Sequence, residues 1–220
     1  ASYSTAVEKP SYTYATGSSA VSLTVSFSLD MSTLPKSPFT DVVAGSWYFD
    51  AALYASSHNL MLGTSPTEFS PNITMTRGML VTVLYRMNGS PSVSGKTPFT
   101  DVRTDEWYSA AVLWAYQNGI VTGMSDTTFA PINNVTREQM ATILFRYTKT
   151  AAPDKAKASA DLSGFADAGS VNDWAVDAMR WAVGQKLIAG ITLEQSVYLQ
   201  PRGNATRAQA ATVLTRYYAQ

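Results

Sequence analysis

Four residue types that can contact a ligand recur three times along the chain, always in the same order. An Asp near the start of each copy is followed by a Trp, then by a Gly, and last by an Arg that directly follows a Thr. The four sets are Asp41, Asp101 and Asp167; Trp47, Trp107 and Trp174; Gly63, Gly123 and Gly190; and Arg77, Arg137 and Arg207. Because the Arg side chain is a planar fork of donors that fits a carboxylate in two hydrogen bonds, the repeat directs attention to anion recognition.

The Arg of each copy lies at the predicted start of a helix. The sequences 136–139 and 206–209 form capping boxes, in which Thr caps the helix and Gln bonds back to it, whereas Met79 replaces the Gln in the first copy. A helix start carries unsatisfied N–H groups and a partial positive charge, which favour an anion. A cation there opposes the dipole, so its recurrence calls for a partner anion, either a ligand or a carboxylate of the protein.

Each copy is predicted to form helix, loop and helix. Apolar residues recur with the spacing of one helical face in both elements. The first helices carry Tyr48, Ala51, Ala52 and Ala55, then Tyr108, Ala111, Val112 and Ala115, then Ala175, Ala178, Met179 and Ala182; the second carry Leu80, Val83, Leu84 and Met87, then Met140, Ile143, Leu144 and Tyr147, then Ala210, Val213, Leu214 and Tyr217. The first helices are expected to end near Asn59 and Asn118-Gly119, residues that tolerate the left-handed conformation.

Residues 1–37 lie outside the repeat and are rich in Ser, Thr and Tyr. Apolar residues alternate with polar ones over 21–29, which predicts a strand. We interpret this segment as a linker or the end of a preceding domain, and we expect the partner of the strand to lie outside this chain. Since the chain starts at Ala1 without Met or a signal peptide, we expect it to be a processed or excised piece of a longer protein.

Composition excludes several classes of function. Sixteen basic residues balance sixteen acidic ones, which argues against a nucleic-acid binder. No apolar run is long enough to span a membrane, so we expect no membrane insertion. With no Cys and a single His, His58, the sequence offers no thiolate chemistry and no His-based triad or metal site. We expect no catalytic residue, no metal and no cofactor.

The three copies resemble the S-layer homology domain, a module usually found in threes at one end of Gram-positive surface proteins. The resemblance covers residues 38–220 and rests on the Phe-x-Asp opening, the Trp-Tyr pair, the Gly segment and the Thr-Arg helix start. It implies a mainly α-helical fold in which three helix-loop-helix modules form a pseudo-threefold spindle with a central helix bundle. We assign the modules to residues 38–94, 95–152 and 153–220.

The resemblance also implies binding of secondary cell wall polysaccharide in grooves between modules, often through a pyruvylated amino sugar. The family's Thr-Arg-Ala-Glu motif falls on 76–79, 136–139 and 206–209, so Arg77, Arg137 and Arg207 inherit the role of contacting the anion. No copy keeps the Glu of the motif. The third copy lacks the Tyr after Trp174, has Leu199 in place of Phe, and carries an insertion before Pro201, so unequal grooves are expected.

The other recurring residues suit the same ligand. A Trp can stack on the apolar face of a sugar, an Asp can accept hydrogen bonds from sugar hydroxyls, and a Gly lets the backbone approach a ligand. Structural alternatives stand beside these roles: the Trp residues could be core anchors, the Asp residues could cap a turn or a helix, and the Gly residues could form turns.

We therefore expect a non-enzymatic, extracellular module that anchors a surface protein to the Gram-positive cell wall by binding an anionic, pyruvylated polysaccharide. The alternative is a protein assembly module, in which the strand at 21–29 mediates self-association or pairs with another surface protein. A glycan-processing enzyme would need two carboxylates about 5 to 9 Å apart in a cleft, whereas only one Asp recurs in each copy.

Overall fold

The computed structural model describes residues 13–16, 19–22, 37–157 and 160–219, which belong to two units, Ala1–Lys36 and Ser37–Gln220. In the first unit, β1 (Thr13–Thr16) pairs antiparallel with β2 (Ser19–Ser22). The strand predicted over 21–29 therefore begins at Ser19, and for residues 19–22 the partner lies within this chain, contrary to our expectation. Residues 23–29 lie outside the described part.

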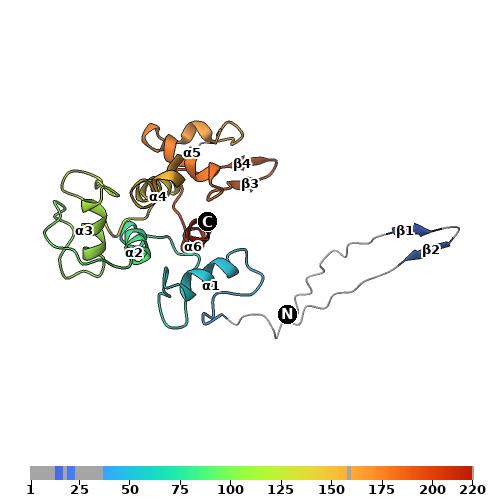
Figure 1. Cartoon of the computed structure of the whole chain (residues 1–220), viewed down its shortest axis with the longest axis horizontal. Helices are drawn as coiled ribbons and strands as arrows, with labels where there is room; N and C mark the ends of the chain where they lie inside the picture. Colours follow the sequence, from blue (N-terminus) through green and yellow to red (C-terminus); the bar gives the residue numbers. More distant parts are fainter. Residues whose placement is uncertain (1–12, 17–18, 23–36, 158–159, 220) are drawn as a thin grey trace. The chain divides into compact units, whose positions relative to one another are not determined.

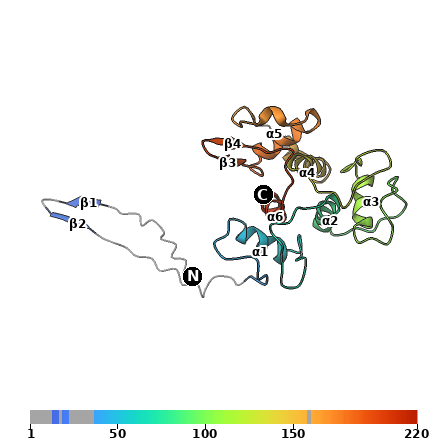
Figure 2. The ribbon, with the colours of Figure 1, turned by 180° about the vertical axis from the view of Figure 1, so that it is seen from behind.

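The second unit is mainly α-helical, as predicted (Figure 1). Three helices follow the loops and three precede them. The former are α2 (Arg77–Met87), α4 (Arg137–Ala151) and α6 (Arg207–Tyr218), and the latter are α1 (Phe49–Ser57), α3 (Ser109–Gln117) and α5 (Val176–Gly184). Helices α2, α4 and α6 surround the centre of this unit, with α1, α3 and α5 outside them (Figures 1 and 2).

The third copy carries additional short elements. Three 3₁₀ helices, Pro153–Lys157, Ala168–Ser170 and Asp173–Ala175, lie between α4 and α5. The insertion before Pro201 forms a hairpin of β3 (Ile191–Leu193) and β4 (Ser196–Tyr198). The first helices end as the sequence predicts, because Asn59 and Gly119 adopt left-handed conformations with φ of 56° and 68°.

Each lobe of the unit combines helices from two copies. Helix α3 packs on α2, α5 packs on α4, and α1 packs on α6. The Ala stripe of the first helices belongs to the core, since Ala52, Ala115 and Ala182 are almost completely buried. A lobe is therefore built from the second helix of one copy and the first helix of the next, and the α1–α6 lobe joins the first copy to the third.

Three backbone hydrogen bonds close into a ring where the copies meet. The amide of Met75 donates to the carbonyl of Ala205 over 2.8 Å, the amide of Val135 to Met75 over 2.9 Å, and the amide of Ala205 to Val135 over 2.9 Å. All three residues are fully buried. Since a buried amide without a partner is costly, each copy satisfies one neighbour and depends on the other.

The helices that begin just after this ring are capped by Thr. The Oγ1 atoms of Thr76, Thr136 and Thr206 each accept a hydrogen bond from the amide three residues later. Gln139 and Gln209 complete reciprocal boxes, as predicted, while Met79 leaves the box of α2 incomplete.

The ring predicts a single cooperative unfolding transition. Leu214→Ala removes a fully buried side chain from α6 and should destabilise the unit by about 2 to 5 kcal/mol. Because α6 packs on α1 and the ring couples all copies, calorimetry should show one transition shifted to lower temperature. Separate transitions for individual lobes would contradict a ring that couples them.

Completing the box of α2 should stabilise the unit. In Met79→Gln, the new amide can accept a hydrogen bond from the backbone N–H of Thr76, a bond that Thr136 makes to Gln139 in the second copy. We expect a gain of about 0.5 to 1 kcal/mol in chemical denaturation. The converse change, Gln209→Met, should lose a similar amount, and equal shifts in the same direction would refute the interpretation.

Candidate functional site

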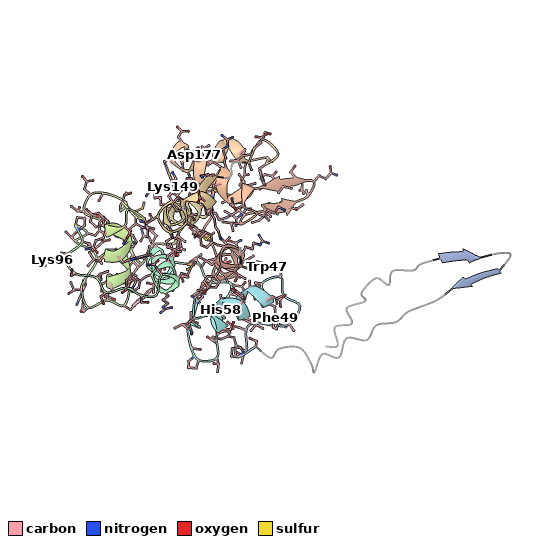
Figure 3. All side chains as sticks on the ribbon, in the orientation of Figure 1. Trp47, Phe49, His58, Lys96, Lys149 and Asp177 are labelled. Atoms are coloured by element: carbon pink, nitrogen blue, oxygen red, sulfur yellow. The ribbon has the colours of Figure 1, made fainter. Side chains whose placement is uncertain are left out.

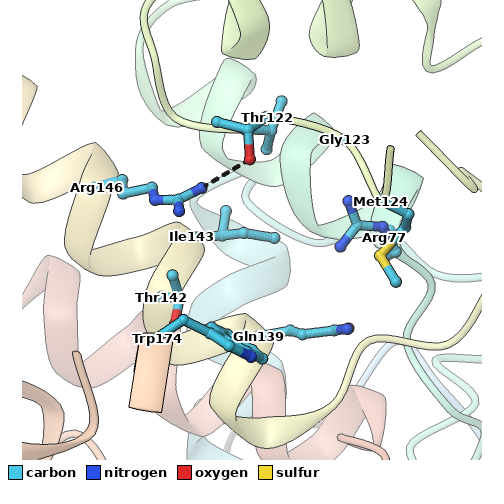
Figure 4. Close-up of a pocket in the computed structure, with 10 residues that line it drawn as sticks. Arg77, Thr122, Gly123, Met124, Gln139, Thr142, Ile143, Arg146 and Trp174 are labelled. Carbon is cyan, nitrogen blue, oxygen red and sulfur yellow. Dashed lines mark hydrogen bonds between the residues drawn. The ribbon is translucent and has the colours of Figure 1, made fainter. Parts of the chain in front are cut away.

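Two grooves of similar construction lie where the copies meet. Groove 1, of about 440 Å³, is bounded by the loop 61–64, helix α2, Trp107 of the second copy and Arg207 of the third. Groove 2, of about 330 Å³, is bounded by the loop 121–124, helix α4, Trp174 of the third copy and Arg77 of the first (Figure 4). Each groove thus combines a Trp, a Gly and an Arg from three different copies. Because these residues are far apart in sequence, no local sequence pattern could show that they lie together.

The grooves also contain residues to which the sequence analysis gave no ligand role. These occupy matching positions in the two grooves: Leu62 and Thr122, Met79 and Gln139, Thr82 and Thr142, Val83 and Ile143, Arg86 and Arg146. Their constant offset from the Gly or the Thr-Arg of each copy was visible in the sequence. What was missing was the knowledge that this face of the second helix lines a groove.

The recurring Trp residues are surface residues and not core anchors. Trp47, Trp107 and Trp174 are 66%, 59% and 54% exposed. Trp47 and Trp107 rest edge-on against the following Tyr, with ring centroids 5.3 and 5.1 Å apart. Figure 3 draws the side chains of this unit, with Trp47 among those labelled. An exposed, partly supported indole ring is a suitable platform for a sugar face or another apolar surface.

The Arg residues of the Thr-Arg motif are buried and hold neighbouring copies together. Each Nε donates to a backbone carbonyl of the next copy: Arg77 to Phe129 over 2.9 Å, Arg137 to Leu199 over 2.7 Å, and Arg207 to Phe69 over 2.8 Å. The guanidinium groups of Arg77 and Arg207 also lie over the rings of Phe129 and Phe69, 4.7 and 4.8 Å from the centroids. Leu199 removes this cation–π contact from Arg137.

The outer nitrogens of these Arg side chains differ between the copies. The Nη2 atom of Arg207 donates to the carbonyl of Leu62 over 2.7 Å, whereas the structure gives the Nη atoms of Arg77 and Arg137 no hydrogen-bond partner. No buried side-chain nitrogen or oxygen within the described residues lacks a partner. The Nη atoms of Arg77 must therefore reach the surface of groove 2.

No carboxylate of the described residues forms an ion pair with these cations. Within the described residues, the ion pairs are Arg103–Asp105 and Lys157–Asp154, both exposed. Burial lowers the pKa of Arg77, Arg137 and Arg207. The negative charges of Asp101, Asp167 and Asp41, respectively, raise these pKa values, but they offset the effect of burial only in part. Since a guanidinium stays protonated in proteins, both grooves keep a positive charge that no ion pair within the described residues neutralises.

The helix starts themselves are not free to bind an anion. The amides of Arg77 and Gly78 donate to the carbonyls of Asn133 and Pro131 in the next copy, and the amide of Met79 donates to Thr76. The same pattern holds at α4 and α6. The expectation that unsatisfied N–H groups would hold the anion is therefore wrong, because other copies of the repeat occupy them. What remains is the guanidinium.

The repeated Asp residues cap the turn before each second helix. Both oxygens of Asp41 accept backbone amides, from Phe69 over 2.8 Å and Ser70 over 2.6 Å; Asp101 and Asp167 do the same for residues 129–130 and 199–200. The residues lining the two grooves include none of these Asp side chains. Each Asp acts on a groove indirectly, since its turn supplies the carbonyl that orients an Arg.

Gly63 and Gly123 line the grooves and are also required by the local backbone. At Gly123 φ is +82°, and a Cβ atom would lie 2.5 Å from the carbonyl oxygen of Ser125 and 2.6 Å from Cε1 of Phe99. Gly190 has φ of +81° and would meet Val197 and Phe165. The turn and the groove therefore depend on the same residue.

Gly123→Ala should destabilise the unit by about 3 kcal/mol, since it combines left-handed strain with a clash against backbone. Gly119→Ala is the matched control: φ is +68° there, but a Cβ atom meets nothing within 4 Å, so only about 1 kcal/mol is expected. Thermal denaturation distinguishes the two. Equal losses would show that the packing around Gly123 can yield.

Comparison with known families assigns all three copies to one family. Residues 38–78, 98–141 and 164–211 each match the S-layer homology domain. The chain belongs to this family. Membership places the S-layer homology unit at the bacterial cell surface and makes it an anchor to the cell wall, which confirms the predicted family, mainly helical fold and location.

Curated relatives of the S-layer homology unit differ in what the remainder of each protein is. The chain is 34% identical over 81% of its length to an endoglucanase of Bacillus sp. (strain KSM-635), and 28% identical over 80% to an amylopullulanase of Thermoanaerobacterium thermosulfurigenes. It is 32% identical over 70% to the surface-layer 125 kDa protein of Lysinibacillus sphaericus. The chain spans only 18%, 9% and 12% of these proteins. The unit is thus the part that enzymes and a surface-layer protein share.

Among the described residues, no helix is long and apolar enough to cross a membrane. The same residues contain no group of three or more His, Cys, Asp or Glu side chains that could hold a metal ion.

Proposed function

We propose that the S-layer homology unit anchors a larger protein to the cell wall by binding an anionic, pyruvylated polysaccharide in grooves 1 and 2. The observation that carries this proposal is the pairing, in each groove, of an exposed Trp with a buried guanidinium that forms no ion pair within the described part of the chain. The ring of a sugar stacks on the Trp, and the carboxylate of the pyruvate ketal pairs with the Arg.

Two grooves on one rigid unit allow one polymer to be held at two points. Once the first groove is occupied, the second binds at the high effective concentration set by the polymer between them. Weak individual contacts then give a stable attachment, as an anchor requires.

The proposal predicts that Trp107→Ala and Trp174→Ala each weaken binding to purified Gram-positive walls by about tenfold, because each removes a stacking platform. The double variant should lose more than either single variant, since binding at two points is abolished. The measurement is co-sedimentation, before and after the secondary polysaccharide is stripped from the walls.

Leu193→Ala is the matched control, because Leu193 is 47% exposed on β3 and lies outside both grooves. It should sediment like the unaltered chain. If the folded, unaltered chain fails to sediment with pyruvylated walls, the proposal is overturned in favour of an assembly role; binding that survives stripping would direct it to another wall polymer.

A further inference from the structure

A second cation lies in groove 2. Arg146, in the last part of α4, lines the cavity together with Arg77 (Figure 4). Its Nη1 atom lies 3.4 Å from Oγ1 of Thr122, a weak contact with a neutral group. Arg146 precedes the last turn of α4, whose basic residue is Lys149, so interaction with the helix dipole does not account for this cation.

The two cations of groove 2 repel each other, and no acidic side chain of the described residues lines the cavity to separate them. The charge of Arg146 contributes to the lowered pKa of Arg77, after the larger effect of burial. Placing two positive charges in one partly enclosed space is unfavourable unless a ligand supplies negative charge.

The two guanidinium groups lie on different sides of the cavity. In Figure 4, Arg77 lies beside Gly123 and Met124, while Arg146 lies beside Thr122, with Ile143 between them and Trp174 along one side. A single small carboxylate at Arg77 therefore leaves Arg146 unpaired. A ligand that pairs with both must extend across the cavity from Arg77 to Arg146, with the indole ring of Trp174 along one side.

The other two copies lack this arrangement. In groove 1, Arg86 matches Arg146, but Nη2 of Arg207 is already bound to the carbonyl of Leu62, and Leu62 and Met79 replace the polar Thr122 and Gln139. In the third copy, Nη1 of Arg216 donates to the carbonyl of Leu187 over 3.1 Å. Of the two grooves, groove 2 is therefore the one in which two guanidinium groups, those of Arg77 and Arg146, are available to a ligand and Thr122 and Gln139 add polar groups to the lining.

We infer that groove 2 is a two-cation clamp that binds two anionic groups of one saccharide segment, the first at Arg77 and the second at Arg146, with Trp174 against the ring that joins them. This inference rests on the proposed function for the source of the saccharide, but it makes a separate statement about its chemistry. The ligand is a dianionic oligosaccharide with its two negative charges on adjacent sugars, and not a sugar with a single carboxylate.

The test compares Arg146→Gln with Arg216→Gln. Two probes are titrated by calorimetry: purified pyruvylated wall polysaccharide and digalacturonate, with monogalacturonate as the reference that carries one carboxylate. Arg146→Gln should weaken binding of either dianionic ligand by about tenfold, since a charged hydrogen bond is lost, and should leave binding of monogalacturonate unchanged. Arg216→Gln should bind both probes like the unaltered chain.

A charge-conserving variant separates recognition from a structural effect. Arg146→Lys should restore most of the affinity for the dianionic probes, and thermal denaturation should show that Arg146→Gln remains folded. If Arg146→Gln binds both probes as tightly as the unaltered chain, or if the unaltered chain binds neither probe, the clamp is refuted.

The same experiment separates this inference from the proposed function. A chain that binds walls, but whose affinity is unaffected by Arg146→Gln, keeps its anchoring role and loses the clamp. A chain that does not bind walls, but whose binding of digalacturonate depends on Arg146, keeps the clamp and loses the assigned polymer.

Discussion

The ring of hydrogen bonds among Met75, Val135 and Ala205 fixes the relative positions of the three copies, and both grooves depend on it. The helices α2, α4 and α6 begin two residues after these positions, with their first amides bound to the turn of the next copy. An Asp of the same copy stabilises each of these turns by accepting hydrogen bonds from its backbone amides. Because the same turn carbonyl receives the Nε of an Arg, the geometry of the ring is transmitted to the guanidinium groups in the grooves.

The sequences of the copies differ at positions where the copies contact different neighbours, and the position of Gly78 is one example. A Cβ atom at Gly78 would lie 3.0 Å from the carbonyl oxygen of Pro131 and 3.4 Å from the ring of Tyr108, so a small residue fits best there. The third copy has Ala175 in place of that Tyr, and the equivalent of Gly78 in α4 is the buried Glu138. Its carboxylate accepts hydrogen bonds from the amide and the side chain of Asn172. A polar network thus fills the position that an aromatic ring occupies elsewhere.

The sequence was sufficient to predict the fold but not the partners of its polar groups. Periodicity located the helices, and the spacing of Thr136 and Gln139 located a helix start, because these signals are local. The contacts of the Arg77 guanidinium could not be predicted in this way. Its Nε donates to the second copy and its Nη atoms face groove 2, and both contacts depend on residues far away in the sequence. For the same reason the sequence left two roles open for Asp101, binding a ligand or capping a turn. In the structure both of its carboxylate oxygens accept hydrogen bonds from backbone amides.

Because the α1–α6 lobe joins the third copy to the first, the structure closes with three copies of the repeat. Every second helix needs a turn from the following copy, and every first helix needs the second helix of the preceding one, with the last copy serving as the predecessor of the first. Adding or deleting one repeat would not lengthen or shorten this structure; it would leave a helix start and a helix face unmatched. Cutting the chain between copies and joining its old ends would, in contrast, preserve every contact of the ring. Selection can therefore alter each groove separately, but it must keep three copies.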